Sequence, residues 1–577
     1  MDPKRIALFA LASLLVACAA PRGGDPLPFV PADADNVLIV PSLAELQTNA
    51  STFLAGIEGT SGLLELAADR FGLDLRTADG PSHLGLDPTR GLALYTTKPP
   101  APSAPTPGAE PEPGQALPAL IIALPVARPD TFREVLALRL TRSAGLTPTP
   151  APADNTPQVF TSKSTSVAVG LVDTPEGQVG LLHIAAVTAS ADPLAAWRAV
   201  AARPATPFVG SPRDRAVPDS TLRFAWRFTP PPTPDGLGLL RGLVDNIAER
   251  LSSWEGSLTL DADRLALKMA TAQPPADATP LPVAWVNPDD PKPSRLAAVF
   301  PRTSTAVLRF RVNLDKVRAV PAFIRNNVVP DQLPGLEAFP LPATSDLINL
   351  LDGDLAVAFL GLAPETRLPE LSSRASLNRL PDVARLALAA GLRDAAAFSR
   401  TYAAIADQLA TSGWTVAKIP PSTSPAANAK AGQTPNRNPW SGWTFKAPNR
   451  EHNGRTFEGR SYTLLHDDAV AVFLVGHGEA DNFIAVREGR ALPLSSFATA
   501  DATNTASPAS PGAARALGHD STTSFLGLTL SPVRLTRELA ARSVPPYFLK
   551  IINDIRLFAG DLAATPDGVT LHLELDL

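Results

Sequence analysis

The 577-residue sequence contains two series of segments that match each other in order, and this internal repeat limits what the chain can fold into. Val30–Leu38 and Phe300–Leu308 each give a proline, a short polar stretch and an apolar run, and they match without a gap. Gly91–Tyr95 then matches Asp354–Ala358, again as an apolar run. Self-similarity of this kind predicts one structural plan used twice.

The parallel continues through both halves of the chain. Each half has a helical pattern, and Gly145 and Gly413 stand where these helices should stop. Thr131 and Glu134 have the spacing of a capping box at the start of the first helix. The predicted helix faces are Phe132, Val135, Leu136 and Leu140 in the first half, and Phe398, Tyr402, Ile405 and Leu409 in the second.

Strand patterns flank these helices in the same order in both halves. The halves also end alike, because Gly256–Leu260 matches Gly560–Ala564 without a gap and each run alternates apolar and polar positions, as an antiparallel pair does. Further strands are predicted at 119–126, 166–172, 179–187 and 222–228 in the first half, and at 384–390, 461–465, 469–475 and 525–530 in the second.

The pattern predicts an α+β fold with two tandem repeats of one unit. Each unit should have a mostly antiparallel sheet with flanking amphipathic helices, since strands outnumber crossover helices. We expect the first unit over 29–271 and the second over 296–577, joined by a proline-rich linker at 272–295. Additional helices are predicted at 237–251 and 533–555.

Much of the chain's proline lies in a few segments rich in Pro, Ala, Ser and Thr. Such segments bury too little apolar surface to offset the entropy of ordering them, so they are predicted to be surface loops inserted into the units. They lie near 99–117, 148–157, 420–439 and 498–514.

Charge and motifs argue against several classes of function. The net charge of −5 gives no basic footprint for a nucleic-acid partner. The sequence contains no nucleophile-elbow, phosphate-loop or zinc-protease motif, so we predict no cofactor, no metal and no catalytic residue. Gly236–Gly242 resembles part of a dinucleotide fingerprint, but the spacing is one residue too long, so we interpret it as a flexible helix start after a proline turn.

Two polar or aromatic groups remain as candidates. The run from His466 to Asp481 contains imidazoles and carboxylates, which are metal-ligand types, but a buried strand separates its two ends. The alternative is a polar hairpin turn at His466 and a helix start capped by Asp481. Trp440 and Trp443 end a proline-rich loop, and they either bind a glycan or partner or pack the loop end onto the unit.

The N-terminal eighteen residues predict where the protein is delivered. Lys4 and Arg5 precede a short apolar run, Ile6–Val16, which is about half the length that spans a bilayer. The four residues Leu15-Val16-Ala17-Cys18 resemble a bacterial lipobox. That resemblance implies a signal peptide over 1–17, cleavage between Ala17 and Cys18, a diacylglycerol-modified and acylated Cys18, and a lipidated tether over 18–28.

Cys18 is also the single cysteine, so lipidation would leave no thiol for a disulfide. Ala19 and Ala20 follow it, and by resemblance to the usual sorting rule the absence of Asp there favours the outer membrane of a Gram-negative bacterium. The opening Phe29–Leu43 and the segment Gly85-Leu86-Asp87-Pro88 resemble a family of bacterial envelope proteins without an established activity. The resemblance implies an envelope context and supplies no catalytic residue.

These features together predict a lipid-anchored envelope protein that acts by binding or scaffolding, with the membrane and an envelope protein as its partners. Two alternatives stay open at this point. One is a periplasmic carrier that holds an apolar ligand between sheet and helices, and the other is a hydrolase whose active site has no recognisable motif.

Overall fold

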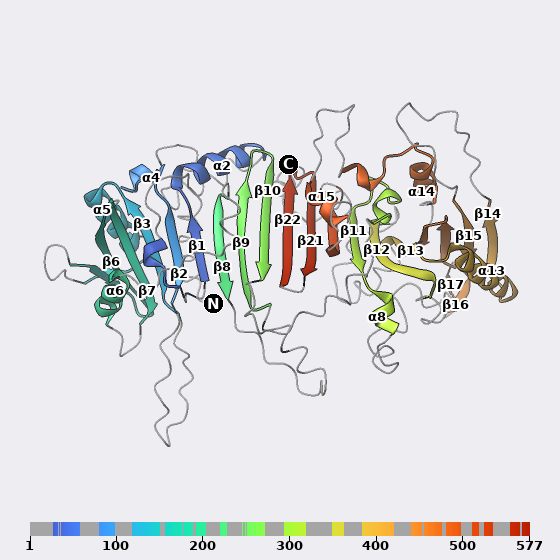
Figure 1. The fold of residues 1–577 in the computed structure, drawn as a ribbon, viewed down its shortest axis with the longest axis horizontal. Coiled ribbons are helices and arrows are strands. Elements are labelled where there is room, and N and C mark those ends of the chain that lie inside the picture. The colour runs from blue at the N-terminus through green and yellow to red at the C-terminus, as the bar shows by residue number, and fades with distance from the viewer. Residues whose placement is uncertain are drawn as a thin grey trace, which may run out of the picture. The chain divides into compact units, whose positions relative to one another are not determined.

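The structure is a computed structural model that divides into two compact units, Met1–Pro274 and Pro275–Leu577. It describes residues 27–57, 80–97, 118–149, 156–187, 192–202, 220–227, 251–271, 294–318, 349–362, 384–420, 440–475, 480–497, 511–517, 524–534 and 554–577, apart from a few positions, singly or in pairs, inside these ranges, together with the isolated positions 245 and 249. Figure 1 shows both units as antiparallel sheets with helices against them.

The first unit is built on one sheet whose described neighbours are all antiparallel. Its strand order is β4-β5-β6-β7-β3-β2-β1-β8-β9-β10. The strands are β1 (Asn36–Val40), β2 (Leu92–Thr96), β3 (Leu120–Val126), β4 (Thr147–Pro148), β5 (Gln158–Thr161), β6 (Thr165–Thr174), β7 (Gly177–Ala186), β8 (Leu222–Arg227), β9 (Ser253–Leu260) and β10 (Arg264–Thr271).

Small side chains in the central strands let larger groups approach the first sheet closely. Ala93, Ala123 and Ala168 are fully buried in one cluster that also holds Trp197. The Trp197 indole lies over Gly170, where a Cβ would come within 2.4 Å of the ring, and its Nε1 donates to the Leu181 carbonyl at 2.9 Å. The helical elements are η1 (Leu27–Phe29), α2 (Leu43–Ala55), α4 (Gly80–His83), α5 (Pro129–Arg142) and α6 (Pro193–Ala201).

The second unit is also one antiparallel sheet in its described part, with strand order β14-β15-β18-β19-β13-β12-β11-β20-β21-β22. A separate hairpin, β16 (Arg450–His452) with β17 (Arg455–Phe457), lies between β15 and β18 in the chain. The sheet strands are β11 (Ala306–Arg311), β12 (Leu351–Leu362), β13 (Ala384–Leu392), β14 (Thr415–Ile419), β15 (Ser441–Lys446), β18 (Ser461–His466), β19 (Val470–Val475), β20 (Ser524–Leu530), β21 (Leu557–Thr565) and β22 (Gly568–Asp576).

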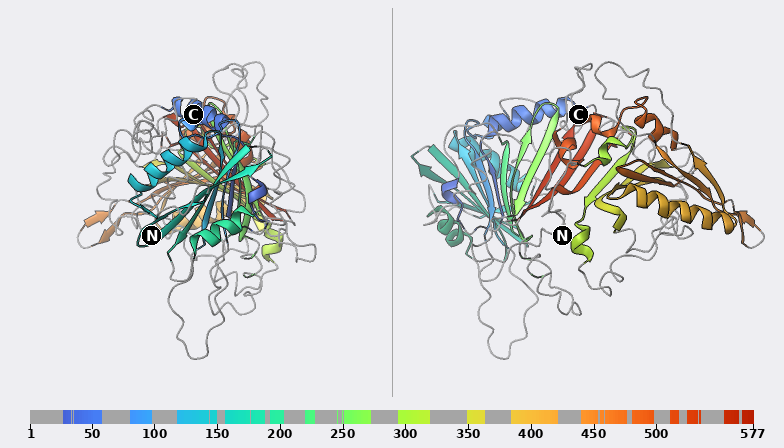
Figure 2. Two further views of the ribbon diagram at one scale, coloured as in Figure 1. Left: turned by 90° about the vertical axis from the view of Figure 1, so that its left-hand side faces the viewer. Right: turned by 45° about the vertical axis from the view of Figure 1, so that its right-hand side comes forward.

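Helix α13 (Ala395–Thr411) covers one face of the second sheet (Figure 2). Asp394 caps its start by accepting from the Ala397 N–H at 2.8 Å, and Phe398 and Tyr402 pack on strand residues that include Phe473. The opposite face holds a second cluster with Phe300, Trp440 and Phe483. The remaining helical elements are η5 (Leu296–Ala298), α8 (Leu314–Arg318), α14 (Ala480–Arg487), η8 (Leu494–Phe497) and α15 (Pro511–Ala516).

The predicted α+β class with a mostly antiparallel sheet is confirmed, and three local predictions are wrong. Helix α5 begins at Pro129, so Thr131 lies inside its first turn and does not form the N-cap of a capping box. Pro148 belongs to β4 and pairs with Phe160, although we expected a loop. The expected loop at 498–514 contains the start of α15, because Ala513 and Ala514 are buried against the sheet.

Several predicted segments cannot be compared with the structure. The signal peptide and most of the tether, the loops near 99–117 and 420–439, most of the linker at 272–295, the glycine segment 236–242 and most of the helices at 237–251 and 533–555 lie outside the described residues.

The helix stops at Gly145 and Gly413 have the backbone conformation that the sequence led us to expect. Their φ angles are +64° and +85°, in the left-handed region that favours glycine, and they follow α5 and α13 respectively. A Cβ at either position would meet no atom within 4 Å, so the requirement for glycine comes from the backbone alone.

Replacing Gly413 by alanine should therefore destabilise the protein by about 1 kcal/mol, because alanine is strained in a left-handed conformation. Gly413→Asn should cost less, since asparagine tolerates this region better than alanine does. Chemical denaturation of both variants measures the difference, and an alanine variant as stable as wild type would contradict the assignment.

Candidate functional site

The residues that the sequence singled out as the lipidation and cleavage site, Ala17 and Cys18, lie outside the described residues. The structure therefore says nothing of the anchor. Within the described residues, no helix combines the length and the apolar character needed to cross a membrane.

The polar run that begins at His466 forms a hairpin turn between β18 and β19. The Asp467 carboxylate accepts from the backbone N–H groups of Ala469 and Val470 at 2.7 Å each and forms an ion pair with Arg487. His466 is buried and stacks on Trp443 with ring centroids 5.6 Å apart. Burial lowers the pKa of His466, since the charged form loses hydration.

The far end of that run does not join the turn. Residues 476–479, which include His477 and Glu479, lie outside the described part, and Asp481 lies in the first turn of α14 rather than before it. No group of three or more His, Cys, Asp or Glu side chains is placed to hold a metal ion in the portions of the chain that the structure describes. The hairpin-turn interpretation of His466–Asp467 accounts for the contacts that are present.

Trp440 and Trp443 are packing residues. Both are buried, and Trp440 Nε1 donates to the Phe483 carbonyl at 3.3 Å while the Arg487 guanidinium lies 5.3 Å from the centroid of its ring. An aromatic side chain with this little exposure cannot meet a glycan or partner, so the binding interpretation of these two residues is wrong.

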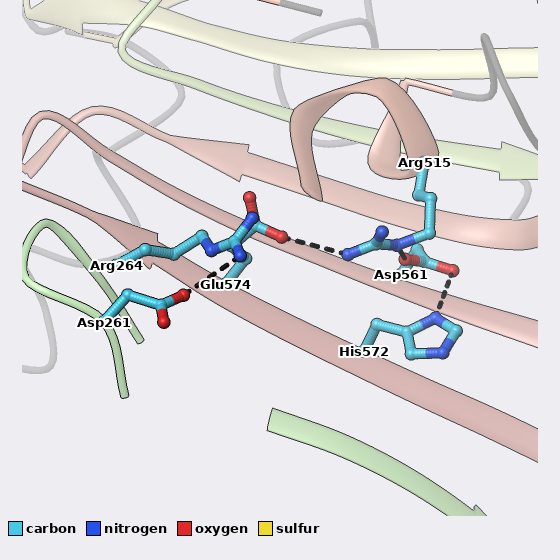
Figure 3. Close-up of polar contacts among 6 residues, drawn as sticks. All are labelled: Asp261, Arg264, Arg515, Asp561, His572 and Glu574. Atoms are coloured by element: carbon cyan, nitrogen blue, oxygen red, sulfur yellow. Dashed lines mark hydrogen bonds and ion pairs between the residues drawn. The ribbon is translucent and has the colours of Figure 1, made fainter. Parts of the chain in front are cut away.

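The second unit instead carries a group of buried charges that the sequence analysis missed (Figure 3). Arg515, on α15, lies between two carboxylates of adjacent strands: its Nε is 3.3 Å from Asp561 Oδ1 and its Nη2 is 3.1 Å from Glu574 Oε2. His572 Nδ1 lies 3.4 Å from Asp561 Oδ2. Figure 3 also draws Asp261 and Arg264, which form a separate pair at the β9–β10 turn of the first unit.

The two carboxylates are almost fully buried, with side-chain exposures of 2% for Asp561 and 3% for Glu574. Two buried carboxylates without a cation would be costly at this depth, and Arg515 contacts both. Helix α15 approaches β20 closely at this point, because Gly527 leaves room for the Ala516 carbonyl. The arrangement fixes α15 on the sheet.

A second buried ion pair lies on β11 and β12. Arg309 Nε is 2.9 Å from Asp354 Oδ1, and the Ser294 hydroxyl donates to the other oxygen of this carboxylate. Arg309 Nη1 donates to the Ser524 carbonyl at 3.4 Å. Arg311, on the same strand face, has its pKa lowered, chiefly by burial and then by the nearby charge of Arg309.

A signal for these charges was present in the sequence match between the two halves. The alignment of Gly256 with Gly560 also aligns Asp561 with Ser257, and the same offset aligns Glu574 with Ala270. Charged residues at strand positions that are small and uncharged in the other half indicate an internal partner, which the chain supplies as Arg515.

No family model matches the chain, and no curated protein matches it either. Three crystal forms of TP0453, a treponemal protein, are among the solved structures that it resembles. Form III gives a TM-score of 0.23 at 13% identity over 43% of this chain and 79% of that chain. Form I gives 0.22 at 14% identity over 45% and 82%. At such scores no property can be transferred.

Removing the cation of this group should be strongly destabilising. Arg515→Met would leave Asp561 and Glu574 buried without their shared partner, and we expect a loss of about 3 kcal/mol in the free energy of unfolding. The matched control is Arg490→Met, because Arg490 pairs with Glu488 but is 62% exposed, and its loss should cost about 0.5 kcal/mol or less. Equal effects in urea denaturation would contradict this assignment.

A buried histidine in the first unit should make stability depend on pH. His183 is 7% exposed on β7, burial lowers its pKa, and its Nδ1 has no hydrogen-bond partner among the described residues. The unfolded chain therefore takes up this proton before the folded protein does, so stability should fall as pH drops below about 6.5.

His183→Leu should reduce the loss of thermal stability between pH 7 and pH 5, since leucine has no proton to take up. Melting curves of both proteins across this range test the point, with the comparison at pH 8 as the control for packing. An identical acid-induced decrease in the variant would show that His183 does not contribute.

Proposed function

We propose that this protein is a lipid-anchored component of the bacterial cell envelope, built from two tandem copies of one antiparallel α+β unit and acting by binding. The anchor rests on the sequence, in which Lys4 and Arg5, the apolar run Ile6–Val16 and the lipobox ending in Cys18 stand in the order that lipoprotein export requires. Two or more acyl chains on Cys18 would meet the need for more than one membrane signal.

The strand orders support the duplication. Each strand of the first unit has a counterpart in the second. Strands β1–β5 correspond to β11–β15, β6 and β7 to β18 and β19, and β8–β10 to β20–β22. Exchanging the counterparts turns one strand order into the other. All ten strands take part, with β16 and β17 as an addition in the second unit. Two unrelated sheets would have no reason to share an order in which β7 pairs with β3 and β19 pairs with β13.

The pairing of residues between neighbouring strands also supports the duplication. Val37 pairs with Tyr95 in the first unit, and Val307 pairs with Ala358 in the second, which are the residues that the sequence match aligns. Likewise Phe224 pairs with Gly256, and Leu528 pairs with Gly560. Gly145 and Gly413 occupy equal places before β4 and β14 with the same positive φ.

The observation that carries a binding role over an enzymatic one is the use of the buried charges. Four buried carboxylates of the second unit each pair with an arginine of that unit: Asp354 with Arg309, Asp467 with Arg487, and Asp561 and Glu574 with Arg515. Carboxylates held in this way stabilise the arrangement of elements, because each is engaged by a buried or half-buried arginine. The described part of the second unit thus resembles a scaffold more than a catalytic site.

Metabolic labelling tests the anchor. Radiolabelled palmitate should enter the wild-type protein in cells and should not enter Cys18→Ser, because serine cannot form the thioether. The wild type should also fractionate with outer membranes. Label retained by the variant at the wild-type level would overturn the proposal, and Arg490→Met, a substitution at an exposed ion pair remote from the anchor in sequence, serves as the control that should still be labelled.

A further inference from the structure

The most exposed large apolar side chain among the described residues belongs to a strand in the first unit. Trp226, on β8, is 58% exposed, and its neighbour Arg227 is also exposed. A single exposed apolar residue is ordinary on a protein surface. The residues beside Trp226 on the same face of the sheet give it a more specific meaning.

Strand register places Trp226 in a row that crosses the first sheet. Its direct partners are Asn36 on β1 and Trp254 on β9, and Asn36 is in turn opposite Thr96 on β2. Side chains directly opposite each other on antiparallel strands share one face and lie about 5 Å apart at Cβ. The row therefore reads Thr96, Asn36, Trp226 and Trp254, two polar groups followed by two indoles.

The polar half of the row is preorganised. Asn36 Nδ2 donates to the Thr96 hydroxyl oxygen at 2.9 Å, which fixes both side chains and leaves the hydroxyl proton of Thr96 without an acceptor in the described part of the chain. Both residues are half-buried. The aromatic half is partly fixed as well, because Trp254 Nε1 donates to the Leu251 carbonyl at 2.7 Å.

The space over Gly256, which pairs with Phe224 next to the row, is filled. Gly256 has no side chain, and a Cβ at this position would lie 2.8 Å from Phe224 Cζ, so the Phe224 ring occupies that space. Phe224 is half-buried, whereas Trp226, two residues along the same strand face, stands open to solvent. The indole of Trp226 is thus the accessible part of the row.

We propose that this row, defined as Thr96, Asn36, Trp226 and Trp254, binds a polysaccharide chain, with Trp226 stacking on a sugar ring. The face of an indole attracts C–H bonds that carry partial positive charge, and one face of a pyranose ring presents several of them. The Trp226 N–H and the Thr96 hydroxyl donate to sugar oxygens at the ring edge. A lipid tail would use the indole but leave the adjacent polar pair without a role.

This inference names a partner for the proposed binding role and rests on that role, but it does not depend on the lipid anchor. The probe is the β-1,4-linked tetramer of N-acetylglucosamine, titrated into the purified full chain in a zwitterionic detergent that has no sugar headgroup. Tryptophan fluorescence and calorimetry should both show saturable binding. Trp226→Ala should weaken it at least tenfold, and Trp226→Phe should have an intermediate effect.

The control is Leu138→Ala, since Leu138 is 44% exposed on α5 and is not part of the row. It should bind as wild type does, and all variants should melt at the wild-type temperature because the replaced side chains are exposed. Absence of saturable binding in the wild type, or wild-type affinity in Trp226→Ala, would overturn the proposal.

A lipid surface is the competing partner, and a second arm identifies it. In vesicles with brominated acyl chains, an indole that enters the bilayer is quenched. Quenching that disappears in Trp226→Ala would show that the row meets lipid and would overturn the glycan assignment. Palmitate labelling of Cys18 is unaffected by either result, so failure here and failure of the anchor remain distinguishable.

Discussion

The backbone ladder between antiparallel strands is the constraint on which the rest of each unit depends. Once β1 lies between β2 and β8, and β11 between β12 and β20, every side chain of those strands is assigned to one face or the other. A slip by one residue would move Val307 and Arg309 away from their buried positions. The cores, the ion pairs and the cross-strand row of the first unit are all consequences of this register.

The size of the strand side chains determines which residues pack on each face of a sheet. Ala356, Ala358, Ala387 and Ala389 are buried on one face of the second sheet, and their small volume allows Phe300, Trp440 and Phe483 to lie close to the strands. On the other face, larger residues such as Phe473 meet α13. The sequence has a single cysteine, so no disulfide can form within it. Each unit is therefore held together by this packing together with hydrogen bonds and ion pairs.

The two units carry different side chains at the strand positions that the sequence match aligns. Positions that hold Ile39, Ser257 and Ala270 in the first unit hold Arg309, Asp561 and Glu574 in the second. Buried ion pairs add little net stability compared with apolar packing, but removing one partner is costly. The second unit is therefore more sensitive to single substitutions at these sites, and its charges specify how α15 and the segment at Ser294 sit on the sheet.

Sequence reasoning succeeded where a local pattern is tied to the backbone and failed where burial depends on distant residues. The strands predicted at 222–228 and 525–530 are present as β8 and β20, and Gly145 and Gly413 were recognisable because few other residues stop a helix in a left-handed conformation. Composition misassigned Pro511–Ala514 as a loop, since alanine is weakly apolar and its burial depends on the space that Gly527 leaves.

The tryptophans also show that burial cannot be predicted from local sequence. Trp440 and Trp443 follow a proline-rich segment, and exposure was one of the two interpretations that the sequence left open. Both are buried instead, in different clusters, where Trp440 contacts Phe483 and Trp443 contacts His466. Trp226 lies in an ordinary strand pattern and is exposed because its neighbours across the sheet, Asn36 and Trp254, do not cover it. Exposure of an aromatic side chain is thus a property of the cross-strand row, which no single segment of sequence contains.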